Sequence, residues 1–320
     1  MRIYIVSDIH YASPAEQARR DHEFKGISNP ITRSLLRAYR DYLWLKNPTN
    51  QNHLLDHFLE QTGDADFVVA NGDYSCNTGF IGVADEAACQ SADICLSRLR
   101  QQFGSRFQAV FGDHELGKLS LAGNQGGLRL GSWHRAIGPL KLEPFWKVEF
   151  GNYVLMGVVS TLLALPVFEP ETLASEMPEW RALREIQLQK IRQTFEHLKP
   201  KQKVVLFCHD PTALPFLWRE PAVRAGIAQV EQTIIGHLHS PLILWKSHFL
   251  AGIPRITFLG NSVRRFSTAL HEARHWQEFR VRLCPSLAGI ELLKDGGYLA
   301  MDLDPEGKAP LRIEQKRIVR

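Results

Sequence analysis

Short runs of β-branched and aromatic residues recur along the chain, and each run ends in polar residues. Five of these runs are followed within three positions by an aspartate or a histidine: residues 3–6, 67–70, 107–111, 204–207 and 232–235. Such runs are typical of buried strands. A helical pattern over residues 180–198 lies between the third and fourth runs. Alternating strands and helices predict an α/β sandwich.

The polar strand ends predict a shared binding crevice. In α/β folds, binding residues gather where loops leave the carboxyl ends of the strands. Five strand ends that each carry an aspartate or a histidine are therefore expected to bring these side chains together.

A single domain covering residues 1–320 is the simplest organisation, because the strand-end pattern continues without a linker or an internal repeat. Residues 11–62 are expected to form an insertion or cap, since they are too long for an ordinary loop. A helical addition is expected at 263–288, after a strand at 255–259. A C-terminal hairpin is expected at 297–318.

Composition narrows the class of protein. A hydrophobic content of 44% supports a sizeable core, and a net charge of +4 favours anionic partners without indicating specific nucleic-acid binding. The five cysteines lack paired spacing and the chain starts without a signal-like apolar run, so a cytoplasmic location is expected. Residues 153–168, the most apolar stretch, are too short for a transmembrane segment and predict a buried strand followed by a loop.

The polar strand ends form an ordered series of motifs. In chain order they read Asp8-Ile9-His10, Gly72-Asp73, Gly112-Asp113-His114-Glu115, His209 and Gly236-His237-Leu238-His239. This series resembles the signature of calcineurin-like metallophosphoesterases, which is DxH, GD, GNH[ED], H and GHxH. The resemblance covers residues 8–239 and implies an αββα sandwich with two packed mixed β-sheets and helical cap insertions.

The resemblance also implies a dinuclear metal centre and no organic cofactor. Carboxylates and imidazoles suit first-row divalent ions, with manganese expected and iron, zinc or a mixed pair as alternatives. The implied metal ligands are Asp8, His10, Asp73, Asp113, His209, His237 and His239, with Asp73 bridging the two ions. A metal-bridging hydroxide is then the expected nucleophile, and His114 is expected to face the scissile phosphate as a proton donor or a transition-state stabiliser.

The expected activity is hydrolysis of a phosphodiester, a pyrophosphate or a phosphomonoester. The substrate is expected to be a phosphorylated small molecule, a nucleotide or a lipid-linked compound. Two alternatives stay open. One is a hydrolase of a lipid-linked nucleotide-sugar diphosphate, and the other is a non-catalytic scaffold that keeps the fold, against which the complete ligand series argues.

Asp113 departs from the family pattern, which usually has asparagine there. Three carboxylates and a bridging hydroxide against two divalent ions would leave the site near neutral, which predicts a preference for diesters or diphosphate linkages over monoesters. The alternative is that Asp113 accepts a proton or a hydrogen bond locally and changes little.

Both additions carry basic and aromatic residues. In the predicted helix over residues 31–45, Arg33, Arg37 and Arg40 share one face. The addition at 263–288 contains Arg264, Arg265, Arg274, Arg280 and Arg282 among Phe266, Leu270, Trp276 and Phe279. These segments are expected to wall the crevice, with contact to substrate, peripheral contact to a membrane, or a solvated lid helix as the possible roles.

Overall fold

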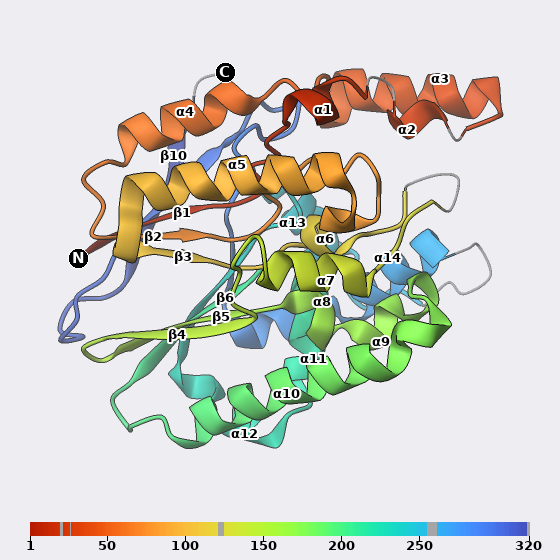
Figure 1. Ribbon diagram of the computed structural model, residues 1–320. Helices are drawn as coiled ribbons and strands as arrows, with labels where there is room; N and C mark the ends of the chain where they lie inside the picture. Colours follow the sequence, from red (N-terminus) through yellow and green to blue (C-terminus); the bar gives the residue numbers. More distant parts are fainter. Residues whose placement is uncertain (20–21, 26, 121–124, 255–260, 319–320) are drawn as a thin grey trace.

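Two five-stranded mixed sheets, with helices on their outer sides, make up the computed structural model of the chain (Figure 1). The structure describes residues 1–19, 22–25, 27–120, 125–254 and 261–318. This arrangement confirms the predicted αββα sandwich. The expected strand at 255–259 lies outside the described residues.

The first sheet has the strand order β10-β9-β1-β2-β3. Its strands are β1 (Arg2–Val6), β2 (Phe67–Ala70), β3 (Phe107–Ala109), β9 (Gly297–Asp302) and β10 (Arg312–Arg317). Strands β1, β2 and β3 run parallel, whereas β9 pairs antiparallel with both β1 and β10. The three parallel strands therefore end at the same edge of the sheet.

The second sheet has the strand order β4-β5-β6-β7-β8. Its strands are β4 (Phe145–Phe150), β5 (Tyr153–Val158), β6 (Lys203–Cys208), β7 (Val230–Ile235) and β8 (Val281–Leu283). Only β4 is antiparallel to its neighbour, and β5 to β8 run parallel. Both sheets thus present parallel strands whose carboxyl ends can carry polar loops.

Side chains alternate between two cores along each buried strand. Ile3 and Ile5 of β1 pack in the cluster that joins the sheets, whereas Tyr4 and Val6 pack in the cluster under the helices. This two-residue period is the geometry of a strand that is buried on both faces. Trp146 of β4 crosses the interface and donates a hydrogen bond from Nε1 to the carbonyl oxygen of Ala109, at 3.0 Å.

Two long helices cover opposite sides of the sandwich (Figure 1). Helix α5 (Glu86–Phe103) lies over the first sheet and begins at Asp85, whose carboxylate accepts hydrogen bonds from the amides of Ala87 and Ala88. Helix α10 (Met177–Glu196) lies over the second sheet, close to the predicted helix at 180–198. Burial of one face of each helix against a sheet holds the layers together.

The shorter helices follow the chain around the sheets. They are α1 (Pro14–Gln17), α2 (His22–Lys25), α4 (Asn52–Gln61), α6 (Asp113–Leu116), α7 (Leu130–Ile137), α11 (Leu214–Trp218), α12 (Pro221–Ala225), α13 (Pro241–Phe249) and α14 (Asn261–Glu272). Short 3₁₀ segments lie at Gly82–Ala84, Gly104–Arg106, Glu169–Glu171, Ala174–Glu176, Pro211–Ala213, Ile227–Gln229 and Ala273–Phe279. No helix among the described ranges is long and apolar enough to cross a bilayer.

The prediction for residues 153–168 is half wrong. The strand is present as β5, but the expected loop is formed by α8 (Ser160–Leu163) and α9 (Leu165–Phe168). Pro166 does not prevent α9, because it occupies the first turn, where a missing amide proton costs no hydrogen bond. Buried residues on most sides hide the helical period that would have identified these two helices.

Residues 11–62, which are expected to form an insertion or cap, divide into a packed part and an unpacked part. Helix α4 buries Leu54, Leu55 and Phe58 against the body. Helix α3 (Pro30–Tyr39) and the π-helix that continues it (Arg40–Trp44) bury no side chain, and α3 extends beyond the sheets at the upper right of Figure 1. Packing therefore anchors the end of the insertion, and α3 projects from it.

The Trp146 ring lies against Gly157 on the paired strand, where a Cβ would overlap the ring. Gly157→Ala is therefore expected to destabilise the fold by about 1–3 kcal/mol. Chemical denaturation measures this free energy of unfolding. Gly131→Ala is the control, since its Cβ would approach nothing nearer than 3.7 Å. Equal stability of the Gly157→Ala variant and the wild type would contradict this packing.

Candidate metal centre

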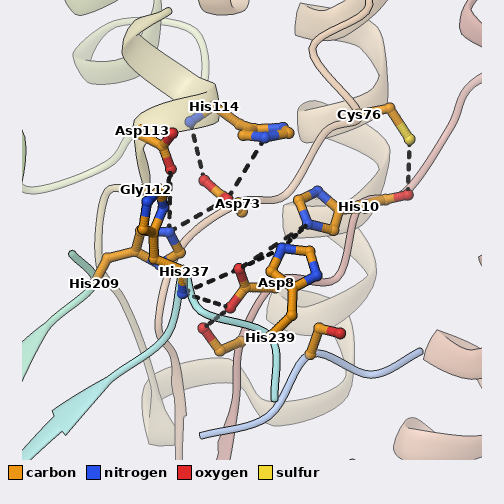
Figure 2. A network of polar contacts seen from close by, with 12 residues as sticks. Asp8, His10, Asp73, Cys76, Gly112, Asp113, His114, His209, His237 and His239 are labelled. Carbon is orange, nitrogen blue, oxygen red and sulfur yellow. Dashed lines mark hydrogen bonds and ion pairs between the residues drawn. The ribbon is translucent and has the colours of Figure 1, made fainter. Parts of the chain in front are cut away.

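Aspartate and histidine side chains from both sheets meet at the carboxyl ends of the parallel strands. Figure 2 shows Asp8 and His10 after β1, Asp73 after β2, Asp113 and His114 at the start of α6, His209 after β6, and His237 and His239 after β7 pointing toward one another. The five polar strand ends identified in the sequence therefore meet at one place.

One group of four side chains lies around His209. The donor atoms of Asp73, Asp113, His209 and His237 all lie within 4.8 Å of one another. Nε2 of His209 is 3.3 Å from Oδ2 of Asp73 and 3.3 Å from Oδ1 of Asp113, and Nδ1 of His237 is 3.0 Å from the same Asp113 oxygen. Two carboxylates and two imidazoles are thus aimed at one point.

A second group is formed by Asp8, His10 and His239. Nε2 of His239 lies 3.3 Å from Oδ1 of Asp8 and 3.3 Å from Nε2 of His10. Asp73 also forms a third group with His10 and His114. The structure thus brings all seven expected ligands and His114 together, and it sets Asp73 between the His209 group and His10.

Backbone carbonyls fix which ring nitrogen of the histidines faces the crevice. Nδ1 of His209 lies 2.5 Å from the carbonyl oxygen of Asn71, and Nδ1 of His10 lies 3.2 Å from that of Ser75. Because a carbonyl oxygen can only accept, each Nδ1 carries a proton, and the atom that presents a lone pair once the ring is deprotonated is Nε2. This is the tautomer that a metal ligand needs.

Two buried atoms that lie 3.3 Å apart without a hydrogen bond test whether divalent ions fit here. Oδ2 of Asp73 and Nε2 of His209 are buried and accept no hydrogen bond from a described residue. Leaving such groups unpaired is costly, and a cation between them would satisfy both. The mixed oxygen and nitrogen donors also match the preferences of manganese, iron and zinc. The residues therefore fit a pair of divalent ions.

Five of the expected ligands lie in strained backbone conformations. Asp8, His10, Asp73, His237 and His239 have φ angles of 50°, 49°, 59°, 60° and 60°. The left-handed region costs a residue with a Cβ about 1 kcal/mol or more, so the surrounding structure must hold it. Hydrogen bonds do so here: the amide of Asp8 donates to the carbonyl of Gly72, and the amide of His10 donates to that of Asp73.

Glu115 ties two of the loops together. Its carboxylate accepts hydrogen bonds from the amides of Gly112, Asp73 and Tyr74 at 2.8, 3.0 and 2.8 Å. These contacts fix the loop after β2 against the start of α6, so Glu115 positions Asp73 and Asp113. Sequence reasoning quoted Glu115 within a motif but gave it no role. Its place at the third residue of α6, where a carboxylate reaches back to a helix start, is the signal.

Lys118 changes the charge of the site. Its Nζ lies 3.0 Å from Oδ2 of Asp113. Although burial opposes the shift, the Lys118 ammonium and His237 hold the pKa of Asp113 well below its usual range. The prediction that Asp113 leaves the site near neutral omitted this cation, which offsets the added carboxylate. Asp113 thus accepts a local contact from Lys118, as the alternative expects, and the preference for diesters or diphosphate linkages stays a prediction.

His114 lies beside the expected ligands with one ring nitrogen already engaged. Its Nδ1 donates to the carbonyl oxygen of Ser75 at 2.9 Å, and its Nε2 is 3.7 Å from Oδ2 of Asp73. Burial lowers the pKa of His114 to about 3, so the ring is neutral at neutral pH. Nε2 then has a lone pair, and it donates a hydrogen bond only after gaining a proton.

The cap reaches the crevice through an aromatic side chain. The Trp44 ring lies 4.7 Å from the His239 ring, and Tyr39 stacks on Trp44 with a separation of 6.1 Å between ring centroids. Trp44 lies within the helix predicted over residues 31–45, but sequence reasoning gave it no place at the site. Its position depends on how the π-helix Arg40–Trp44 ends, which the sequence pattern does not reveal.

The arginine face of α3 turns toward the cap itself. The Arg33 guanidinium donates to the carbonyl of Ile27, Arg37 lies over the Phe24 ring at 5.1 Å, and Arg40 forms an ion pair with Glu23. Ile27, Phe24 and Glu23 thus provide a contact for each of the three guanidinium groups. The basic face thus stabilises the base of α3, and the opposite face is left to solvent.

Comparison with known proteins identifies a family. The family model for calcineurin-like phosphoesterases matches residues 1–241. No curated protein gave a significant match.

Solved structures with related folds share little sequence with the chain. A dimetal phosphatase from Danio rerio is 14% identical, with a TM-score of 0.48, over 98% of this chain and 95% of its own. A purple acid phosphatase from yellow lupin seeds is 13% identical, with a TM-score of 0.39, over 75% of this chain and 38% of its own. A phosphopantetheinyl hydrolase from Mycobacterium tuberculosis is 14% identical, with a TM-score of 0.34, over 75% of this chain and 83% of its own.

Coupling between Asp113 and Lys118 can be measured directly. Asp113→Asn is expected to weaken Mn²⁺ binding about 10-fold or more, because it removes a carboxylate and leaves an unpaired ammonium beside the ions. Adding Lys118→Met should recover part of that loss. Calorimetric titration gives the affinities, with Lys147→Met, an exposed lysine paired with Glu149, as the control. Strictly additive effects of the two changes would contradict the pairing.

Proposed function

The chain belongs to the calcineurin-like phosphoesterase family, and from that premise we propose that it hydrolyses a phosphodiester, a pyrophosphate or a phosphomonoester at the crevice between Asp8 and His239. Membership makes the chain a metal-dependent phosphoric ester hydrolase. The observation that carries the proposal is the convergence of seven carboxylate and imidazole donors from both sheets.

We assign the donors to two ions that share Asp73. One ion would be held by Asp8, His10, Asp73 and His239, and the other by Asp73, Asp113, His209 and His237. The grouping of donor atoms supports this, since Asp73 belongs to two overlapping groups. Manganese is the first choice because carboxylates provide three of the seven ligands, and iron, zinc or a mixed pair are the alternatives.

Two divalent ions supply Lewis-acid polarisation of the phosphoryl group and a more acidic water molecule when they are bound. In the overall reaction, the water oxygen forms a bond to phosphorus and the bond between phosphorus and the leaving oxygen breaks. The proton lost by water is balanced by the proton gained by the leaving group. The residues of this chain must therefore hold the phosphate and deliver a proton.

His114 is the residue we assign to the phosphate. Its neutral ring, fixed by the donation from Nδ1 to Ser75, points Nε2 toward Asp73 and the crevice. An anionic substrate would favour protonation of Nε2, after which Nε2–H can donate to a phosphoryl or leaving oxygen. Proton uptake would thus accompany substrate binding.

The compartment of the reaction is also a proposal. All five cysteines are free and none lies at an exposed position. Burial raises the pKa of Cys95 and Cys208, which keeps these thiols protonated and unreactive. These features support a reducing, cytoplasmic location.

The bridging role of Asp73 has a direct test. Asp73→Ala should reduce bound metal below two ions per chain and lower turnover about 1,000-fold or more, because it removes a donor from both ions. Elemental analysis and hydrolysis of a nitrophenyl phosphodiester measure these effects. Asp93→Ala, an exposed position of α5, is the control. Wild-type turnover with full metal content would remove the assignment.

His114→Ala is expected to lower turnover about 100-fold or more with little change in metal content. The loss should be smaller for esters with good leaving groups, since a nitrophenolate needs little protonation. Comparing a nitrophenyl ester with an alkyl ester separates the two roles. An equal loss on both would indicate transition-state stabilisation in place of proton donation, and no loss on either would exclude His114 from catalysis.

A further inference from the structure

Exposed apolar side chains are concentrated in three segments around the crevice. Ten of the thirteen large hydrophobic side chains that are exposed among the described residues lie there. They are Ile31, Leu35, Tyr39, Tyr42, Leu43, Trp245, Phe249, Leu250, Leu292 and Leu293. Single exposed hydrophobic residues are normal, but a contiguous group at one place indicates a binding surface.

Helix α3 supplies one side of this surface. Ile31, Leu35 and Tyr39 follow at four-residue spacing and are 70%, 67% and 38% exposed. They therefore form one apolar stripe along a helix that buries no side chain. Because the arginines of α3 contact residues 23–27, the stripe is the face that the cap leaves open.

Helix α13 supplies the other side. Trp245 and Phe249 stack with ring centroids 6.0 Å apart and are 62% and 78% exposed. Exposing two stacked aromatic rings on a helix that directly follows His239 costs free energy in water, since each ring has a large apolar area. Contact of the two rings with a hydrophobic phase would remove this unfavourable exposure to water.

Backbone contacts connect these segments to each other and to the metal centre. The amide of Glu291 donates to the carbonyl of Trp44 at 2.7 Å, and the Ser240 hydroxyl donates to Asp295 at 2.6 Å. Trp44 itself lies against His239. Residues 31–46 are thus bonded to residues 290–294, and the Ser240–Asp295 bond lies next to the ends of residues 290–294 and 241–250. We call these three segments the docking rim.

Charge distinguishes the docking rim from the rest of the surface. Arg33, Arg37 and Arg40 contact the cap, so the basic side chains that the rim offers to a partner are its three lysines. Lys46, Lys246 and Lys294 are exposed beside its apolar residues and form no ion pair with any residue that the structure describes. Lysines that flank exposed aromatic residues are typical of surfaces that bind anionic lipid.

We propose that the docking rim binds the surface of an anionic lipid bilayer and that the substrate is an amphiphilic phosphoester in that bilayer. The substrate part of this proposal rests on the proposed function. Bilayer binding would bury the aromatic residues at the acyl boundary, set the lysines among the headgroup phosphates, and bring the metal centre to the level of a phosphoester. A second copy of the chain fits less well, because a symmetric contact would oppose equal positive charges.

Sedimentation with vesicles tests the bilayer contact. The wild type should bind vesicles of phosphatidylcholine mixed with phosphatidylglycerol more tightly than vesicles of phosphatidylcholine alone. The double variant Trp245→Ser/Phe249→Ser should bind the mixed vesicles about 10-fold or more weakly. The triple variant Lys46→Glu/Lys246→Glu/Lys294→Glu should lose the preference for anionic vesicles.

Three controls separate docking from folding, catalysis and self-association. Ile186→Ser removes an exposed apolar residue of α10 outside the rim and should bind like the wild type. The rim variants should hydrolyse a soluble nitrophenyl ester at the wild-type rate. Asp73→Ala should bind vesicles normally, so that vesicle binding is measured independently of turnover. A wild-type dimer that dissociates on changing Trp245 and Phe249 would identify the rim as a self-interface and overturn the proposal.

Two matched probes test the substrate class. With mixed vesicles present, nitrophenyl hexadecyl phosphate should be hydrolysed with a kcat/KM about 10-fold or more above that of nitrophenyl methyl phosphate, and Trp245→Ser/Phe249→Ser should abolish the difference. Equal kcat/KM values for the two esters in the wild type would reject the proposal that the substrate is amphiphilic. Vesicle binding without hydrolysis of either ester would reject the proposed function and keep the docking. Hydrolysis of the esters without vesicle binding would reject the docking and keep the proposed function.

Discussion

Three buried carboxylates close to one another are the constraint on which the rest of the structure depends. Asp8, Asp73 and Asp113 are almost fully buried at one end of the sandwich, where neither water nor distance weakens their repulsion. Lys118 offsets one of them. Although burial opposes the shift, the carboxylates raise the pKa of His209 and His237, so protons or metal cations must balance the remaining negative charge. Stability of this end of the fold is therefore linked to metal binding, because ions that bind the folded chain alone shift the folding equilibrium toward it.

Bringing the donors together also requires backbones to approach closely. A Cβ on Gly112 would overlap the Asp73 carboxylate, and one on Gly236 would overlap the Ser7 hydroxyl. Glu115 holds the loops of Gly112 and Asp73 with three hydrogen bonds from backbone amides, so the strained conformation at Asp73 persists. Rigidity of this kind keeps the donor atoms fixed before any ion or substrate arrives, which is the preorganisation that electrostatic catalysis requires.

Local patterns predicted the strands and the donors, whereas contacts between distant segments escaped prediction. Each donor follows a hydrophobic run at a strand end. Parallel strands gather the donors at one edge of each sheet, and packing of the two sheets against each other then brings Asp8 and His209 together. Lys118 is different, since its contact with Asp113 depends on the turn after α6, where Gly117 has a φ of 98°. Trp44 reaches His239 only through the course of the cap. The helices at 160–168 were missed because their burial on most sides removes the amphipathic period.

The two faces of α3 show how one short helix can serve both the fold and the surface. Its arginines contact residues 23–27 of the cap, which fixes the direction in which the helix projects. Fixing that direction leaves the apolar stripe exposed, and the stripe continues through Tyr39 and Trp44 to His239. The arginine contacts hold α3 in place, so the helix does not need to bury its apolar stripe in order to keep its position. The contacts of Arg33, Arg37 and Arg40 with the cap therefore also determine where the apolar stripe of the docking rim lies.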